Sequence, residues 1–69
     1  MPITMAEPGV EYCITRLGGN DEVRRHLAEM GFVPGGKVTL ISDIQGNIIV
    51  NVKNVRVAIS RQMAQKIFI

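Results

Sequence analysis

The sequence predicts a mainly β domain in which five short strands curl into a partly closed barrel, with one inserted α-helix at about residues 20–30. Two observations predict this fold. The second half of the chain is a series of β-branched runs separated by turns that contain glycine or asparagine. The first half holds one amphipathic stretch with clear start and stop signals. Five separate strands would leave two exposed edges, and curling the sheet into a barrel hides them.

The first predicted strand covers residues 10–17, after a turn at Pro8-Gly9. Its residues alternate in polarity, which places Tyr12 and Ile14 on one face. The strand carries the single cysteine of the chain, Cys13, which we interpret as a buried or half-buried small apolar side chain. One cysteine excludes an internal disulfide and a multi-cysteine metal site, which fits a reducing, cytoplasmic location.

The helix begins after Asn20, whose side chain is a favoured cap, and acidic residues follow in its first turn. Val23, Leu27 and Met30 recur at the spacing of one helical face, so this face is expected to be buried. Gly31 then suits the left-handed position that ends a helix.

Phe32 follows this glycine, where it can pack back on Leu27 or stay partly exposed as part of a docking patch. Pro34-Gly35-Gly36 prevents the helix from continuing. The helical segment is therefore expected to end sharply in a turn.

The remaining strands follow one another closely. Glycine and asparagine in the short connections predict tight hairpins, and Ser60 is expected to cap a single helical turn through Ala64. The order of strand, helix and four strands is that of an SH3-like barrel, and its 69 residues allow one domain, 1–69. The four predicted strands are 38–44, 48–52, 55–59 and 66–69.

Charge is divided unevenly along the chain, although the net charge is only +2. Residues 1–36 hold more carboxylates than cations and residues 37–69 hold more cations, which predicts two faces of opposite sign. A barrel that binds nucleic acid with its basic half is an alternative, disfavoured because charge and aromatic side chains are both scarce. Its phosphate contacts would be Lys37, Lys53, Arg56, Arg61 and Lys66.

Catalytic and metal-binding patterns are missing from the sequence. Serine and threonine residues lie in no nucleophile motif, so we expect no catalytic residues, no cofactor and no enzyme activity. Glu22 and His26 are four residues apart on the helix, and we interpret them as a solvated pair rather than metal ligands. The chain also has no apolar run long enough to insert into a membrane.

A family resemblance rests on residues 27–35. Leu-Ala-Glu-Met-Gly-Phe-Val-Pro-Gly, which follows Arg24-Arg25, resembles the L-x-x-(M/L)-G-(F/M)-x-P-G signature of FeoA proteins. Residues 57–69 also resemble the closing pattern of that family, although Asn54 stands where the family often has glycine. The resemblance implies an SH3-like barrel similar to the C-terminal domain of diphtheria-toxin-repressor-type iron regulators.

The resemblance further implies a role in iron homeostasis: an accessory protein that contacts FeoB, a ferrous-iron transporter with a cytosolic G-protein domain. A metal-regulator-like SH3 interaction domain is an alternative, and weak self-association stays open. Activator, nucleotide-exchange aid and scaffold all remain open as modes of action. The expected partner-binding residues are Arg24, Arg25, Leu27, Met30, Gly31, Phe32, Pro34 and Gly35.

Overall fold

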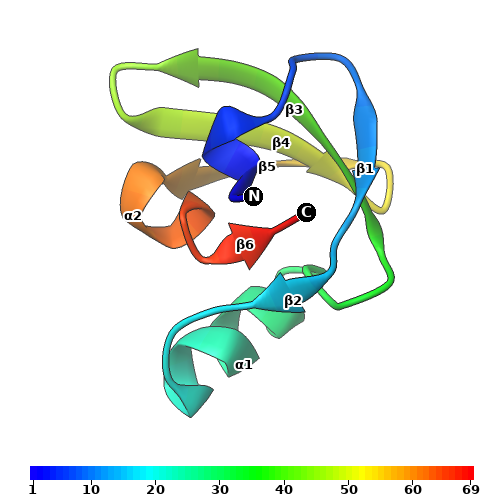
Figure 1. The fold of residues 1–69 in the computed structure, drawn as a ribbon. Coiled ribbons are helices and arrows are strands. Elements are labelled where there is room, and N and C mark those ends of the chain that lie inside the picture. Colours follow the sequence, from blue (N-terminus) through cyan, green and yellow to red (C-terminus); the bar gives the residue numbers. More distant parts are fainter.

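The computed structural model describes residues 1–69 as six strands, two α-helices and one 3-10 helix (Figure 1). All strand pairs are antiparallel, and they form a four-stranded sheet of order β1-β3-β4-β5 and a two-stranded sheet of β2 and β6. The mainly β class with one principal helix is confirmed. In chain order the elements are η1 (Ile3–Met5), β1 (Glu11–Cys13), β2 (Arg16–Leu17), α1 (Asp21–Glu29), β3 (Lys37–Ile44), β4 (Asn47–Val52), β5 (Val55–Ser60), α2 (Arg61–Ala64) and β6 (Ile67–Phe68).

The predicted first strand, residues 10–17, is wrong as a single element because it divides into β1 and β2. The division lies at Ile14 and Thr15. The backbone of Ile14 donates to Gly36 O and accepts from Gly35 N, both at 2.8 Å, and Thr15 N then donates to Phe68 O at 2.8 Å. The chain thus leaves one sheet and joins the other, which raises the strand number from the predicted five to six.

Two tight hairpins build most of the four-stranded sheet. The β3–β4 turn is Gln45-Gly46 and the β4–β5 turn is Lys53-Asn54, and all four residues have positive φ angles between 51° and 83°. Positive φ at both central positions is the mark of a two-residue type I′ turn, whose twist matches that of the strands. A bulge between Leu40 and Ser42 interrupts β3 and bends it.

The core lies between the curved four-stranded sheet and the small β2-β6 sheet. Alternate residues of β3 and β4 point into it, and α1 lies beside β2 at one end of the molecule (Figure 1). Ser60 Oγ accepts from Met63 N at 3.2 Å and so caps α2 as predicted. No helix is long and apolar enough to cross a membrane. The buried side chains are Ile3, Ala6, Ile14, Leu27, Phe32, Val38, Leu40, Ile48, Val50, Val52, Ile59, Ala64 and Ile67.

The two ends of the chain close the barrel together. Met1 N donates to Ile69 O at 2.9 Å, and Ile69 N donates to Met1 O at 2.7 Å. The short helix η1 was not predicted, yet its Ile3 is fully buried. The N-terminal segment is therefore part of the folded core.

Cys13 is exposed, so the prediction of a buried or half-buried thiol was wrong. The reason is the alternation of β1, in which Tyr12 is half-buried between two exposed neighbours. Tyr12 and the buried Ile14 face the core, as predicted, and the residue between them must then face outward.

Candidate docking surface

The first turn of α1 is held by its own side chains. Asn20 Oδ1 accepts from Val23 N at 2.9 Å, which confirms the predicted cap. Arg24 forms an ion pair with Asp21 and donates to Gly19 O at 2.6 Å. The Arg24 guanidinium therefore already has bonding partners within the chain. Arg25, in contrast, is exposed and has no ion-pair partner.

The end of α1 follows a Schellman pattern. Gly31 has a φ of +106° and its N–H donates to Ala28 O, while Phe32 N–H donates to Leu27 O, both at 3.0 Å. Leu27 and Phe32 are both 0% exposed. Phe32 therefore anchors the end of the helix in the core, and the suggestion that it stays partly exposed was wrong.

The segment after the helix is a second rigid turn. Gly36 N donates to Val33 O at 2.9 Å, and the intervening Gly35 has a φ of +88°. Proline followed by a glycine at positive φ is typical of a type II turn. The hydrogen bond from Gly35 N to Ile14 O ties this turn to the junction of β1 and β2.

The structure divides the predicted partner-binding residues into two groups. Leu27 and Phe32 are buried, so their side chains are not available on the surface and act as anchors. Arg24, Arg25, Pro34 and Gly35 are exposed, whereas Met30 and Gly31 are partly buried. We call these six residues, Arg24, Arg25, Met30, Gly31, Pro34 and Gly35, the signature surface.

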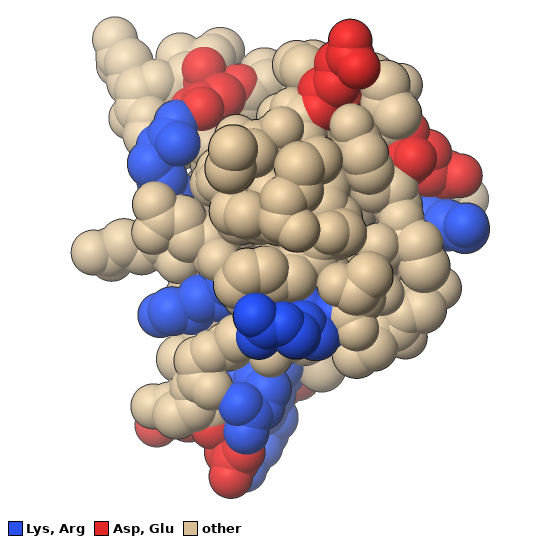
Figure 2. Space-filling model, viewed as in Figure 1, with Lys and Arg blue, Asp and Glu red and all other residues tan.

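Acidic and basic side chains lie together on the face drawn in Figure 2, so this face does not carry a single sign of charge. Basic side chains gather over its lower part and also lie at its upper left and right, while acidic side chains lie along the top, at the right and at the lower tip (Figure 2). Arg61 is paired with Asp43, and the Arg16 guanidinium lies 3.9 Å from the centre of the Phe68 ring. Of the cations assigned to the nucleic-acid alternative, Arg61 is thus already neutralised within the chain.

The structure gathers no group of three or more His, Cys, Asp or Glu side chains that could hold a metal ion. Glu22 and His26 are both exposed on α1.

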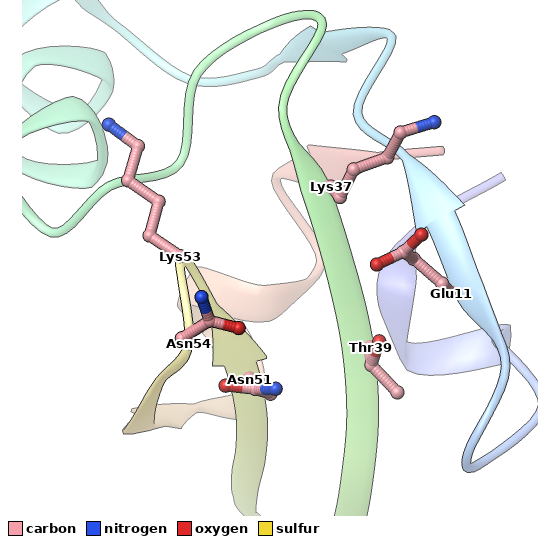
Figure 3. A pocket seen from close by; sticks show the side chains of 6 residues that line it. All are labelled: Glu11, Lys37, Thr39, Asn51, Lys53 and Asn54. Atoms are coloured by element: carbon pink, nitrogen blue, oxygen red, sulfur yellow. The ribbon is translucent and has the colours of Figure 1, made fainter.

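A shallow concavity on the outer face of the four-stranded sheet was missed at the sequence level (Figure 3). Its volume is about 280 Å³, and no hydrophobic residue lines it. The outward positions of β1, β3 and β4 supply most of the lining, so the polar half of the strand alternation was the available signal. The lining residues are Glu11, Lys37, Thr39, Asn51, Lys53 and Asn54.

A small barrel of short antiparallel strands, closed by a single helical turn before its last strand, defines the class of SH3-like domains. The FeoA domain model matches residues 1–69, and the chain therefore belongs to the FeoA family.

Relatives and solved structures agree with this assignment. A protein of Methanocaldococcus jannaschii, named as a candidate Fe(2+) transport protein A, is 28% identical over 68 residues, which are 99% of this chain and 83% of that protein. A crystal structure of an iron uptake regulatory protein, FeoA, is 26% identical with a TM-score of 0.88, covering 97% of this chain and 91% of the other.

Two further structures show the fold alone. FeoA of Stenotrophomonas maltophilia, solved with zinc and described as a prokaryotic SH3 domain protein, is 22% identical, with a TM-score of 0.82 over 97% of this chain and 86% of the other. A manganese-dependent transcriptional repressor is 17% identical, with a TM-score of 0.84 over 97% of this chain and 39% of the other. The chain therefore shares its fold with part of a metal-dependent repressor, as the resemblance implied.

Proposed function

We propose that this chain is a cytosolic, non-enzymatic accessory protein of ferrous-iron transport that docks on the G-protein domain of a FeoB-type transporter. The observation that carries the proposal is the FeoA-domain match over residues 1–69. The Methanocaldococcus jannaschii relative, named for Fe(2+) transport, supports the same role.

The geometry of residues 27–35 suits a docking role. Its buried members, Leu27 and Phe32, fix the segment to the core, and its backbone is closed by hydrogen bonds at both turns. A surface that is already rigid loses little conformational entropy when a partner binds. The signature surface is therefore preorganised, with Pro34 and Gly35 exposed at the second turn.

Arg25 is the member of this surface best suited to test the proposal. It is exposed and has no ion-pair partner, whereas Arg24 forms an ion pair with Asp21 and donates a hydrogen bond to Gly19 O. Replacing Arg24 would therefore disturb the start of α1 as well as any interface. Replacing Arg25 removes no ion pair and no side-chain hydrogen bond of the fold.

The experiment is co-purification of the full chain with the full-length transporter from detergent-solubilised membranes. We expect Arg25→Glu to weaken the association about 3- to 10-fold, because an exposed charge contributes modestly to affinity and its reversal adds repulsion. The thermal midpoint should fall by several degrees, because the new carboxylate would lie one helical turn from Asp21, Glu22 and Glu29. Circular dichroism should show that the variant is still folded at the temperature of the experiment.

The matched control is the double variant Gln62→Glu and Gln65→Glu. Both glutamines are exposed on or beside α2, and the pair changes the net charge by the same amount as Arg25→Glu. The control should associate as the wild type does. Equal association of all three proteins would remove Arg25 from the interface, and absence of any association would remove the docking proposal itself.

A further inference from the structure

We propose that the concavity on the outer face of the four-stranded sheet is a second docking site, which binds the carboxylate side chains of an acidic protein segment. The proposal goes beyond the function proposed above and uses none of the signature surface. It rests on the alignment of polar side chains across four strands and on the cations at this site that have no ion-pair partner.

The strand register brings the polar side chains into one row. Glu11 pairs with Thr39, Thr39 with Asn51, and Asn51 with Arg56. Directly paired residues point to the same face of a sheet, so this row crosses the outer surface from β1 to β5. Figure 3 shows Lys37 and Lys53 on opposite sides of the hollow that results, with both ammonium groups directed outward, away from Thr39 and Asn51.

The site carries an excess of positive charge. Lys37, Lys53 and Arg56 are exposed, and none of them takes part in either ion pair of the structure. Thr39 and the amide group of Asn51 add hydrogen-bond donors between the cations. Carboxylates are the natural ligands of such a set because charged donors form the stronger hydrogen bonds with them.

Lys53 stands at a position where lysine is unfavourable for the fold. Its φ of 52° is left-handed, and it occupies the first central position of a type I′ turn, where asparagine or glycine is preferred. Gln45 holds the same conformation in the other hairpin turn, outside the concavity, so the conformation alone does not mark a site. It does show that the turn gains no stability from lysine, so Lys53 can be replaced without loss to the fold.

A protein segment fits this face better than a nucleic acid does. Glu11 lies within the concavity, and its carboxylate would repel the evenly spaced phosphates of a nucleic acid. The lining also contains no aromatic side chain on which a base could stack. An acidic peptide avoids both problems, since it can place a hydroxyl or amide opposite Glu11 between two carboxylates.

The test uses the full chain and a fluorescent synthetic peptide of alternating Glu and Ser, titrated at low and at physiological salt. We expect saturable binding that weakens with salt, and amide shifts in NMR spectra confined to the lining residues and Arg56. A peptide of alternating Gln and Ser should not bind. Lys37→Ser should weaken the affinity about 2- to 5-fold, the range measured for single exposed ion pairs.

Lys53→Asn gives the sharpest result because affinity and stability should change in opposite directions. Affinity should fall about 2- to 5-fold, while the thermal midpoint rises by about 2–8 °C as the turn becomes favourable. Gln45→Asn is the matched control, since Gln45 holds the same position of the other type I′ turn, with a φ of 51°. It should raise the midpoint without changing the affinity.

Several results would overturn the proposal. They are absence of saturable binding at low salt, equal binding of the Gln-Ser peptide, and tighter binding of a single-stranded DNA than of the acidic peptide. An affinity loss in Gln45→Asn as large as that in Lys53→Asn would also overturn it, because the loss would then come from the turns and not from the charge.

Discussion

The end of α1 offers a direct test of why this chain carries glycine at residue 31. Gly31 has a φ of +106°, a conformation that side chains rarely adopt. A methyl group added there would lie 3.6 Å from Val52 Cγ2 and 3.7 Å from Lys53 Cδ, which is ordinary van der Waals contact. Space is therefore available, and the cost of Gly31→Ala comes from the backbone alone. A left-handed conformation costs an L-residue about 1–2 kcal/mol.

This cost is large for so small a domain. A single core of this size supplies about 3–5 kcal/mol, so Gly31→Ala should remove between a fifth and two thirds of the free energy of unfolding. For a domain of this length each kcal/mol lowers the thermal midpoint by about 4–8 °C, which gives an expected fall of about 4–16 °C.

The measurement is urea and thermal denaturation followed by circular dichroism. The dependence of unfolding free energy on urea should stay the same, because the surface exposed on unfolding does not change. Gly31→Asn should recover part of the loss, since asparagine tolerates positive φ better than alanine does. An alanine variant with the wild-type midpoint would show that the helix end does not depend on the left-handed glycine.

Three further predictions follow from the same structure. Leu27→Ala removes a fully buried side chain at a cost of about 2–5 kcal/mol, so circular dichroism should show a thermal midpoint lowered by at least about 8 °C; a cooperative transition near the wild-type midpoint would contradict this. Asn20→Ala deletes the cap of α1 and should cost about 1 kcal/mol in urea denaturation, and an unchanged midpoint would mean that the cap contributes nothing. The exposed Cys13 should react fully with a thiol reagent in the native protein, and reaction only after unfolding would show that it is covered.

The sequence predicted those parts of the fold that local chemistry decides. Asn20 caps α1 by accepting from Val23 N, and Gly31 ends it by donating to Ala28 O. Both hydrogen bonds join residues that are close in the sequence. The two hairpins and the cap at Ser60 follow the same rule, since turn residues and a capping hydroxyl act on their immediate neighbours.

The parts that the sequence did not predict depend on distant contacts. The break between β1 and β2 arises because Ile14 bonds to the turn after α1 while Thr15 bonds to β6. The helix η1 is held by its buried Ile3 and by the hydrogen bond that joins Met1 to Ile69, at the opposite end of the chain. Neither interaction leaves a periodic pattern in the sequence.

The sequence likewise predicted only part of the candidate functional site. The resemblance singled out residues 27–35 without separating those that build the turn from those that a partner can touch. Burial separates them, because Leu27 and Phe32 lie in the core whereas Pro34 and Gly35 are exposed. The concavity was missed because it combines residues from three strands and a turn, and only the register brings them together.

The most direct test of the proposed function is the uptake of radiolabelled ferrous iron by cells that contain the transporter but lack this chain. Uptake should fall without the chain and return with the wild-type protein. It should return less fully with Arg25→Glu than with the charge-matched double variant at Gln62 and Gln65. Uptake that is the same with and without the chain would contradict a role in ferrous-iron transport.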